Sequence, residues 1–346
     1  MPQGRKREYW VDNTKIIACF FVVIWHLYQS FVKSDILVWG DVFEWFNQSV
    51  ERFHVHLFFI CSGYLYQQYT KMNSFGDKGR FTLKKLLELG VPFFVFCTAL
   101  WALKTIFAGE INNEVGGIVS ALFVSPLAPY WYLYCLFIIF LVTPLLKDAK
   151  TAVAVISIAV IMQITFIIGG NDITVYAVNA LLKYELWFVI GMLMSYLKFS
   201  KIKGSLLLGI VTGALFVAVS IAVYVMNINF YGRDLIMGIL ACTCVISITK
   251  YFDNGKQSKI MAFLSKYTMP IYLMHTIFAA AGRSILFKLG IANPVIHIAA
   301  GLILGFAGPI IAMEVMKRLK LDILAFPTKY IKLHKKAEIK GDSLGY

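Results

Sequence analysis

Long apolar stretches follow one another along almost the whole chain, separated by short polar connectors. A helix that crosses the hydrocarbon core of a bilayer needs about 20 mostly apolar residues. The pattern predicts about ten membrane-spanning helices, near residues 11–32, 50–70, 84–107, 129–146, 151–169, 175–197, 204–226, 233–250, 259–282 and 294–317. Glycine and proline interrupt a further stretch, 114–127, which predicts a short re-entrant or interfacial segment. The expected fold is an all-α, polytopic integral membrane protein.

Composition agrees with this fold class. Hydrophobic residues make up 59% of the 346 and charged residues only 15%, whereas soluble domains carry about 25% charged residues. The mean hydropathy is +0.71. Since no long polar segment divides the apolar stretches, we expect one membrane domain over residues 1–320, followed by a basic cytoplasmic tail over residues 321–346.

The distribution of charge predicts the topology. A net charge of +14 could indicate a nucleic-acid partner, but the basic residues gather in every second connector. With the N-terminus in the cytoplasm, 26 of the 33 lysines and arginines fall on the cytoplasmic side, as the positive-inside rule requires. We therefore expect both termini in the cytoplasm and a lipid bilayer, not nucleic acid, as partner. All six cysteines lie in apolar stretches, which indicates neither a disulfide framework nor a metal site.

A histidine inside the first apolar stretch is the strongest candidate for chemistry. His26 follows Lys15 by eleven residues, so the two side chains share one helix face about 16 Å apart. Ionisable groups within a membrane are costly and mark functional sites by default. A neutral imidazole is a natural general base for a hydroxyl group. The alternative is a structural histidine that bonds to a neighbouring helix.

Three other ionisable side chains within apolar stretches are candidates to orient that imidazole. His54 lies near the outer end of the second stretch, Glu185 within the sixth and His275 within the ninth. Each has a structural alternative, since polar side chains also join membrane helices to one another.

Candidate donor-binding residues lie at two places. Lys71, Arg80, Lys84 and Lys85 follow the second stretch and could contact the phosphates of a nucleotide-like donor such as a coenzyme A, or simply fix the topology. Trp131 and Tyr132 open the fourth stretch, where they could contact the donor or belong to an aromatic belt at the membrane interface.

Several motifs together resemble the acyltransferase family 3 membrane proteins. The string D-x-x-K-x-I-A followed by V-V-x-x-H, from Asp12 to His26, is similar to the first helix of that family, and FHVHLFFICSGYL is similar to its second. Lys84 and Lys85 before Pro92, the tripeptide WYL, the run Y-x-x-W-F-x-x-G and the segment SKYTMPIYLMH resemble later landmarks. The matches keep their order over about residues 8–280.

This resemblance implies a ten-helix, membrane-bound O-acyltransferase that modifies polysaccharides or other envelope compounds in a bacterial plasma membrane. The donor would be cytoplasmic acyl-CoA, most commonly acetyl-CoA, and the acceptor a hydroxyl of a carbohydrate. The catalytic histidine of the family falls on His26 and its basic residue on Lys15, where arginine is more frequent. His56 stands where related sequences often have proline. No metal is implied.

Two other functions fit the same residues. Intramembrane Lys, Glu and His also serve proton relays, which would suit a transporter or flippase for a small polar or lipid-linked substrate. A structural membrane subunit is a third alternative. The sequence leaves open the acceptor, the acyl chain, the side of modification, direct transfer as against an acyl-histidine relay, and the oligomeric state.

Overall fold

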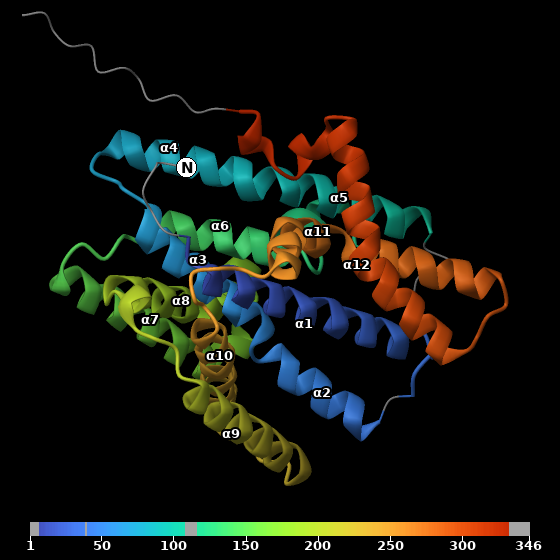
Figure 1. Cartoon of the computed structure of the whole chain (residues 1–346), viewed down its shortest axis with the longest axis horizontal. Helices are drawn as coiled ribbons and strands as arrows, with labels where there is room; N and C mark the ends of the chain where they lie inside the picture. The colour runs from blue at the N-terminus through green and yellow to red at the C-terminus, as the bar shows by residue number, and fades with distance from the viewer. Residues whose placement is uncertain (1–6, 39, 108–115, 332–346) are drawn as a thin grey trace, which may run out of the picture.

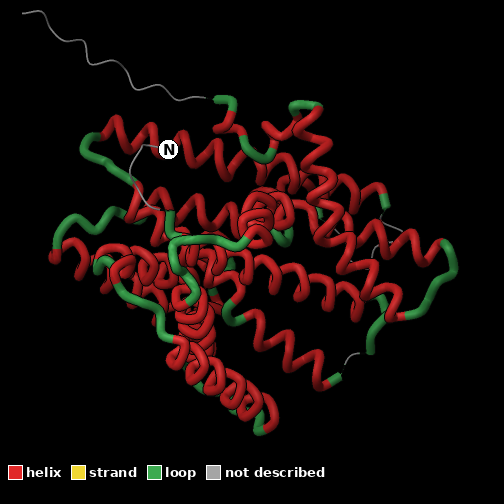
Figure 2. The backbone as a smooth tube through the Cα atoms, viewed as in Figure 1, coloured by secondary structure: helices red, strands yellow, loops and turns green. Residues whose placement is uncertain are grey.

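The computed structural model describes residues 7–38, 40–107 and 116–331, and every regular element in them is helical (Figures 1 and 2). The predicted all-α class is therefore confirmed. The α-helices are α1 (Tyr9–Lys33), α2 (Asp41–Glu51), α3 (His54–Tyr69), α4 (Phe75–Lys85), α5 (Val91–Ile106), α6 (Trp131–Val142), α7 (Ala149–Gly169), α8 (Tyr176–Tyr196), α9 (Leu206–Val225), α10 (Arg233–Tyr251), α11 (Lys259–Lys288) and α12 (Pro294–Arg318). Short helical turns are η1 (Leu86–Gly90), η3 (Ser120–Val124), η4 (Gly170–Asp172), η5 (Phe199–Lys201), η6 (Leu321–Leu324) and η7 (Pro327–Lys329).

Seven helical segments of the described residues are long and apolar enough to cross a membrane, so the chain is a multi-pass membrane protein. They are α1, the continuous segment α4–η1–α5, α7, α8, α9, α10 and α12. The other three predicted spans correspond to α3, α6 and α11. Helices α3 and α6 have 16 and 12 residues, fewer than the roughly 17–25 of a typical span, and α11 is not among the seven although it has 30 residues. The count of ten stays a prediction.

The second predicted span begins at His54 and not near residue 50. Helix α2 ends just before Arg52, whose guanidinium is 2.7 Å from the Asp234 carboxylate and also donates to the carbonyl of Gln48. Only 7% of Arg52 is exposed. A buried cation needs such partners, and here they come from α10 and from the preceding helix.

The third predicted span starts earlier than expected, at Phe75 instead of near residue 84. Ser74 and Asp77 cap the start of α4 reciprocally, which satisfies backbone donors that the first turn leaves free. The helix continues through the π-helical turn η1 into α5. Pro92, at the start of α5, cannot donate a backbone hydrogen bond, and a π-helical turn accommodates such a local irregularity. Within the predicted segment 114–127 the structure has η3, and residues 114 and 115 lie outside the described residues.

Glycines bring α3 and α8 into direct backbone contact. A Cβ atom on Gly63 would lie 1.9 Å from the carbonyl oxygen of Phe188, and one on Gly191 would lie 1.9 Å from that of Ile60. Small residues permit this approach between membrane helices. Helix α1 packs against α3 and also contacts α10 and α11; for example, the Thr14 hydroxyl lies 2.8 Å from that of Thr249 in α10. These contacts fix the helices that carry the candidate residues.

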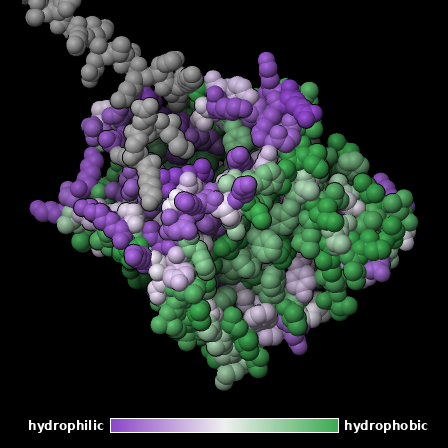
Figure 3. All heavy atoms as spheres, in the orientation of Figure 1, coloured by the Kyte–Doolittle hydropathy of each residue, from purple (hydrophilic) through white to green (hydrophobic). Residues whose placement is uncertain are grey.

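Polar and apolar side chains separate on the surface. Hydrophilic residues gather along the left and upper parts of the face in Figure 3, while hydrophobic residues cover most of its lower and right parts. This is the pattern of a protein with an aqueous end and a lipid-facing belt.

The segment after α12 folds back onto the helical domain. Asp322 is only 1% exposed, and its carboxylate accepts hydrogen bonds from Lys329 at 2.7 Å and from the Tyr330 hydroxyl at 2.5 Å. The bond from Lys329 is the main cause that lowers the pKa of Asp322 below its usual range. Residues 321–331 thus belong to the folded part of the chain, while the remainder of the predicted tail, 332–346, lies outside the described residues.

Candidate active site

Five basic side chains predicted to bind the donor, or to lie below His26, surround one cavity of about 710 Å³. This basic cavity is lined by Lys15, Lys71, Arg80, Lys84 and Lys85, together with the acidic residues Asp12 and Asp77 and several aromatic rings. Helix α1, the connector after α3 and helix α4 contribute these side chains. The structure therefore joins residues that are up to 70 positions apart in sequence.

The basic cavity keeps an excess of positive charge. Arg80 lies 3.7 Å from Asp77, and Lys85 lies 2.8 Å from Glu88. Lys15 is half-buried, and its ammonium makes no ion pair or hydrogen bond within the part of the chain that is described. Lys84 also lies 3.7 Å from Glu88, yet the lining as a whole has five basic residues against two acidic ones, and such an excess of cations attracts an anion such as a phosphate group.

His26 lines a second cavity, of about 250 Å³. This histidine cavity lies between helices α1, α3, α6, α8 and α11. His54, Trp131, Asn179 and Tyr184 also line it. Rings and a few polar groups that converge on an enclosed space are typical of a small-molecule site.

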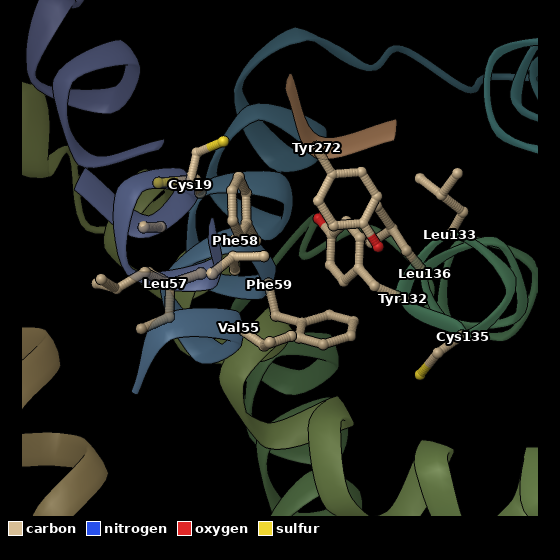
Figure 4. Close-up of a cluster of buried hydrophobic side chains, with 14 of the residues drawn as sticks. Cys19, Val55, Leu57, Phe58, Phe59, Tyr132, Leu133, Cys135, Leu136 and Tyr272 are labelled. Carbon is tan, nitrogen blue, oxygen red and sulfur yellow. The ribbon is translucent and has the colours of Figure 1, made fainter. Parts of the chain in front are cut away.

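Three aromatic rings form the boundary between the two cavities. Phe58 of α3, Tyr132 of α6 and Tyr272 of α11 line both the basic cavity and the histidine cavity. Their ring centroids are 5.6 Å (Phe58–Tyr132), 5.8 Å (Tyr132–Tyr272) and 6.2 Å (Phe58–Tyr272) apart, and Figure 4 shows the rings converging on the same space. We call these three residues the aromatic waist. A molecule that extends from the basic cavity to His26 must pass them.

Two further histidines stand close to His26. The rings of His26 and His275 are 5.3 Å apart, and His54 lines the same cavity. The Nδ1 atom of His54 lies 2.6 Å from the carbonyl oxygen of Val50, and that of His275 lies 3.0 Å from the carbonyl oxygen of Ile271. Because a carbonyl oxygen only accepts, both Nδ1 atoms carry the proton and both Nε2 atoms are acceptors. The Nε2 atom of His275 is buried and has no partner among the described residues.

A family model for an acyltransferase domain, acyltransferase 3, matches residues 8–314. The chain belongs to the acyltransferase 3 family. The match includes every residue that lines the two cavities. No curated protein and no solved structure matches the chain. The resemblance inferred from the motifs is thereby confirmed, and with it acyl transfer between a donor and an acceptor.

The structure places two predicted site residues of this acyltransferase differently from the rest. The Glu185 carboxylate accepts a hydrogen bond from the Thr143 hydroxyl at 2.7 Å. Glu185 is not among the described residues that line the basic cavity or the histidine cavity. Trp131 lines the histidine cavity, not the basic cavity, and its ring stacks on Tyr184 at 5.2 Å. It stands beside His26, away from the predicted phosphate contacts. No group of three possible metal-ligating side chains exists among the described residues.

The histidine cavity is also lined by residues that are not among the site residues predicted from the sequence, such as Phe58, Tyr272, Asn179 and Lys183. Phe58 and Tyr272 lie inside the quoted motifs FHVHLFFICSGYL and SKYTMPIYLMH, so a signal was present. Periodicity alone does not say which rings on different helices of the acyltransferase meet, because that depends on how the helices pack.

Proposed function

We propose that the protein is a bacterial plasma-membrane O-acyltransferase that moves an acyl group, acetyl in the simplest case, from cytoplasmic acyl-CoA to a hydroxyl of a carbohydrate or other envelope compound. The observation that carries this proposal is that the basic cavity and the histidine cavity adjoin at the aromatic waist, whose three rings line both. A donor with phosphates at one end and a thioester at the other fits that arrangement.

The phosphates of the donor would lie among Lys15, Lys71, Arg80, Lys84 and Lys85 in the basic cavity. Cationic side chains bind phosphate through charge-assisted hydrogen bonds. The uncharged arm would pass the aromatic waist and bring the thioester to His26, about 16 Å along α1 from Lys15 by helix geometry. An arm that carries no charge suits a passage between aromatic rings.

His26 would act as the general base. The acceptor hydroxyl oxygen attacks the thioester carbonyl carbon, and His26 takes the hydroxyl proton as the new C–O bond forms. The C–S bond then breaks, and the imidazolium returns its proton to the departing sulfur. His275 and His54 would be positioning residues, since each presents an Nε2 acceptor that can receive the other N–H of His26. A relay through an acyl-histidine is the second mechanism, and it would leave a labelled protein intermediate.

The test measures thiol release from acetyl-CoA by purified protein with envelope carbohydrate as acceptor. His26→Ala is expected to lower turnover by about 100-fold or more, which is the contribution of a positioned acid–base group. The matched control is His297→Gln, because the ring of His297 bonds to the carbonyl of Ile291 outside the described lining of either cavity.

Two results would contradict the proposal. One is wild-type thiol release by His26→Ala. The other is uptake of a small solute into liposomes without any acyl-CoA, which would instead support a transporter.

A further inference from the structure

A third cavity, of about 380 Å³, lies at the other end of the bundle from the basic cavity. It is lined by Arg52, which lies between α2 and α3, by His56 in the first turn of α3 and by Asp234 at the start of α10. The basic cavity is instead lined by the end of α3, at Tyr66 and Tyr69. We call it the polar cavity.

The polar cavity adjoins the histidine cavity. Glu51 and Lys183 line both, so the polar cavity and the basic cavity each border the space around His26, from different sides. A second substrate held in the polar cavity would reach His26 without crossing the aromatic waist.

The charges around the polar cavity balance. Its lining has three acidic residues (Glu44, Glu51 and Asp234) and three basic residues (Arg52, Lys183 and Arg233). Asp234 lies 2.7 Å from Arg52 and 2.9 Å from Arg233, and the Lys183 ammonium lies over the Tyr184 ring at 5.4 Å. In contrast to the basic cavity, this lining favours a ligand without net charge.

A buried amide in this cavity lacks a partner. Gln163 of α7 is 5% exposed, and its Oε1 atom has no hydrogen bond within the described chain. An unpaired buried hydrogen-bond acceptor costs free energy. If Gln163 served only to join α7 to a neighbouring helix, its Oε1 atom would accept a hydrogen bond from that helix. A hydroxyl donor of a bound ligand would satisfy it.

Aromatic rings complete the lining. Trp187 packs against His56 with centroids 4.4 Å apart, and Phe166 and Tyr224 also line the cavity. Amides and carboxylates that bind hydroxyls, beside rings that cover C–H surface, match the two kinds of surface of a sugar ring.

We propose that the polar cavity binds an uncharged, polyhydroxylated ring of the acyl acceptor, with Gln163 as a hydrogen-bond acceptor for one of its hydroxyls. The acceptor enters from the side opposite the donor and presents another hydroxyl to His26 past Glu51 and Lys183. This inference rests on the proposed acyl transfer.

The experiment compares cells that lack this protein after complementation with the wild type, Gln163→Leu, Thr165→Val or His26→Ala. Base-labile acyl esters on envelope carbohydrate are measured, and acetyl-CoA binding to each purified protein is measured by calorimetry. Gln163→Leu should lower the esters by about tenfold, since it removes a hydrogen bond to the acceptor, with donor affinity unchanged. Thr165→Val is the matched control, because Thr165 is on the same helix but exposed, with its hydroxyl bonded to the carbonyl of Ile161.

The outcomes separate the two proposals. Wild-type ester levels with Gln163→Leu and none with His26→Ala would overturn the acceptor site alone. Wild-type levels with His26→Ala would overturn the proposed function. Loss of acetyl-CoA binding by Gln163→Leu would assign Gln163 a structural role and also overturn the acceptor site.

A second variant keeps the test independent of folding. Asn227 is exposed and lines the polar cavity, so Asn227→Cys can be blocked after folding with a bulky, membrane-impermeant maleimide added to intact cells. Labelling should lower ester formation in Asn227→Cys by about tenfold and leave the equally treated wild type unchanged. Full activity of the labelled variant would contradict the site.

Discussion

Lys15 and His26 are two candidate functional side chains on one face of helix α1. The ammonium of Lys15 lies in the basic cavity and the imidazole of His26 lies in the histidine cavity. Both are on α1, and the stagger of the α-helix puts them on one side of it. A single rigid element therefore sets the spacing between the anion-binding end and the proposed base.

At this scale we predict that Lys15→Gln raises the KM for acetyl-CoA about tenfold and changes kcat little. The substitution removes one charge-assisted hydrogen bond to a phosphate, a contact that holds the donor equally before and during reaction. Steady-state thiol release against acetyl-CoA concentration measures both constants.

Lys78→Gln is the matched control for Lys15. Lys78 lies in the same group of basic residues but is exposed and lines neither cavity in the described structure. An equal rise in KM for both variants would show that overall charge, and not the position of Lys15, holds the donor.

At the scale of elements, the aromatic waist depends on the packing of three helices. The hydroxyl groups of Tyr132 and Ser62 form a hydrogen bond of 3.1 Å. The Tyr272 hydroxyl donates a hydrogen bond to the carbonyl of Pro129. These bonds hold two of the three rings, while Phe58 is held by packing alone. The spacing of the three rings is thus set by side-chain packing and these two hydrogen bonds.

We predict that Phe58→Ala shifts preference toward longer acyl chains. Removing the ring leaves space that a butyryl chain can fill, so the ratio of kcat/KM for butyryl-CoA to that for acetyl-CoA should rise about tenfold, a change within what a hydrophobic pocket discriminates. Parallel assays with the two donors measure the ratio.

Phe20→Ala is the control for this ratio. Phe20 lies on α1, is 47% exposed and is not among the described residues that line the basic cavity or the histidine cavity. If Phe58→Ala lowered both activities equally, the ring would serve packing and not selection.

At the scale of the whole molecule, the cavities at the two ends of the helical bundle differ in the net charge of their linings. The basic cavity lies at one end, the charge-balanced polar cavity at the other, and His26 between them. If the predicted topology and the proposed donor are combined, the basic cavity would lie on the cytoplasmic side, where acyl-CoA is supplied.

The topology itself gives a prediction. A cysteine at Asn227 should react with an impermeant maleimide in intact cells, whereas one at Lys201 should react only after permeabilisation, because the positive-inside distribution places residue 201 in the cytoplasm. The two residues flank α9, which runs over Leu206–Val225. Labelling of Lys201→Cys in intact cells would reverse the assigned sides.

Local properties of the sequence determined the fold class, the order of the apolar helices and the basic group near Lys84, and they made His26 the first candidate for chemistry. Hydrophobicity and helical stagger are readable over a few turns, and the family motifs are short strings. The family assignment made from those strings was confirmed by the match over residues 8–314.

Tertiary structure alone decided which side chains meet. Arg52 and Asp234 are 182 positions apart yet form an ion pair, and this contact accompanies the late start of α3. The aromatic waist needs rings from three helices, and Gln163 acquires meaning only because α7 brings it to the polar cavity. Such contacts depend on how the side-chain ridges of one helix pack into the grooves of another and on where glycines permit close approach. The periodicity of a single segment does not specify that packing.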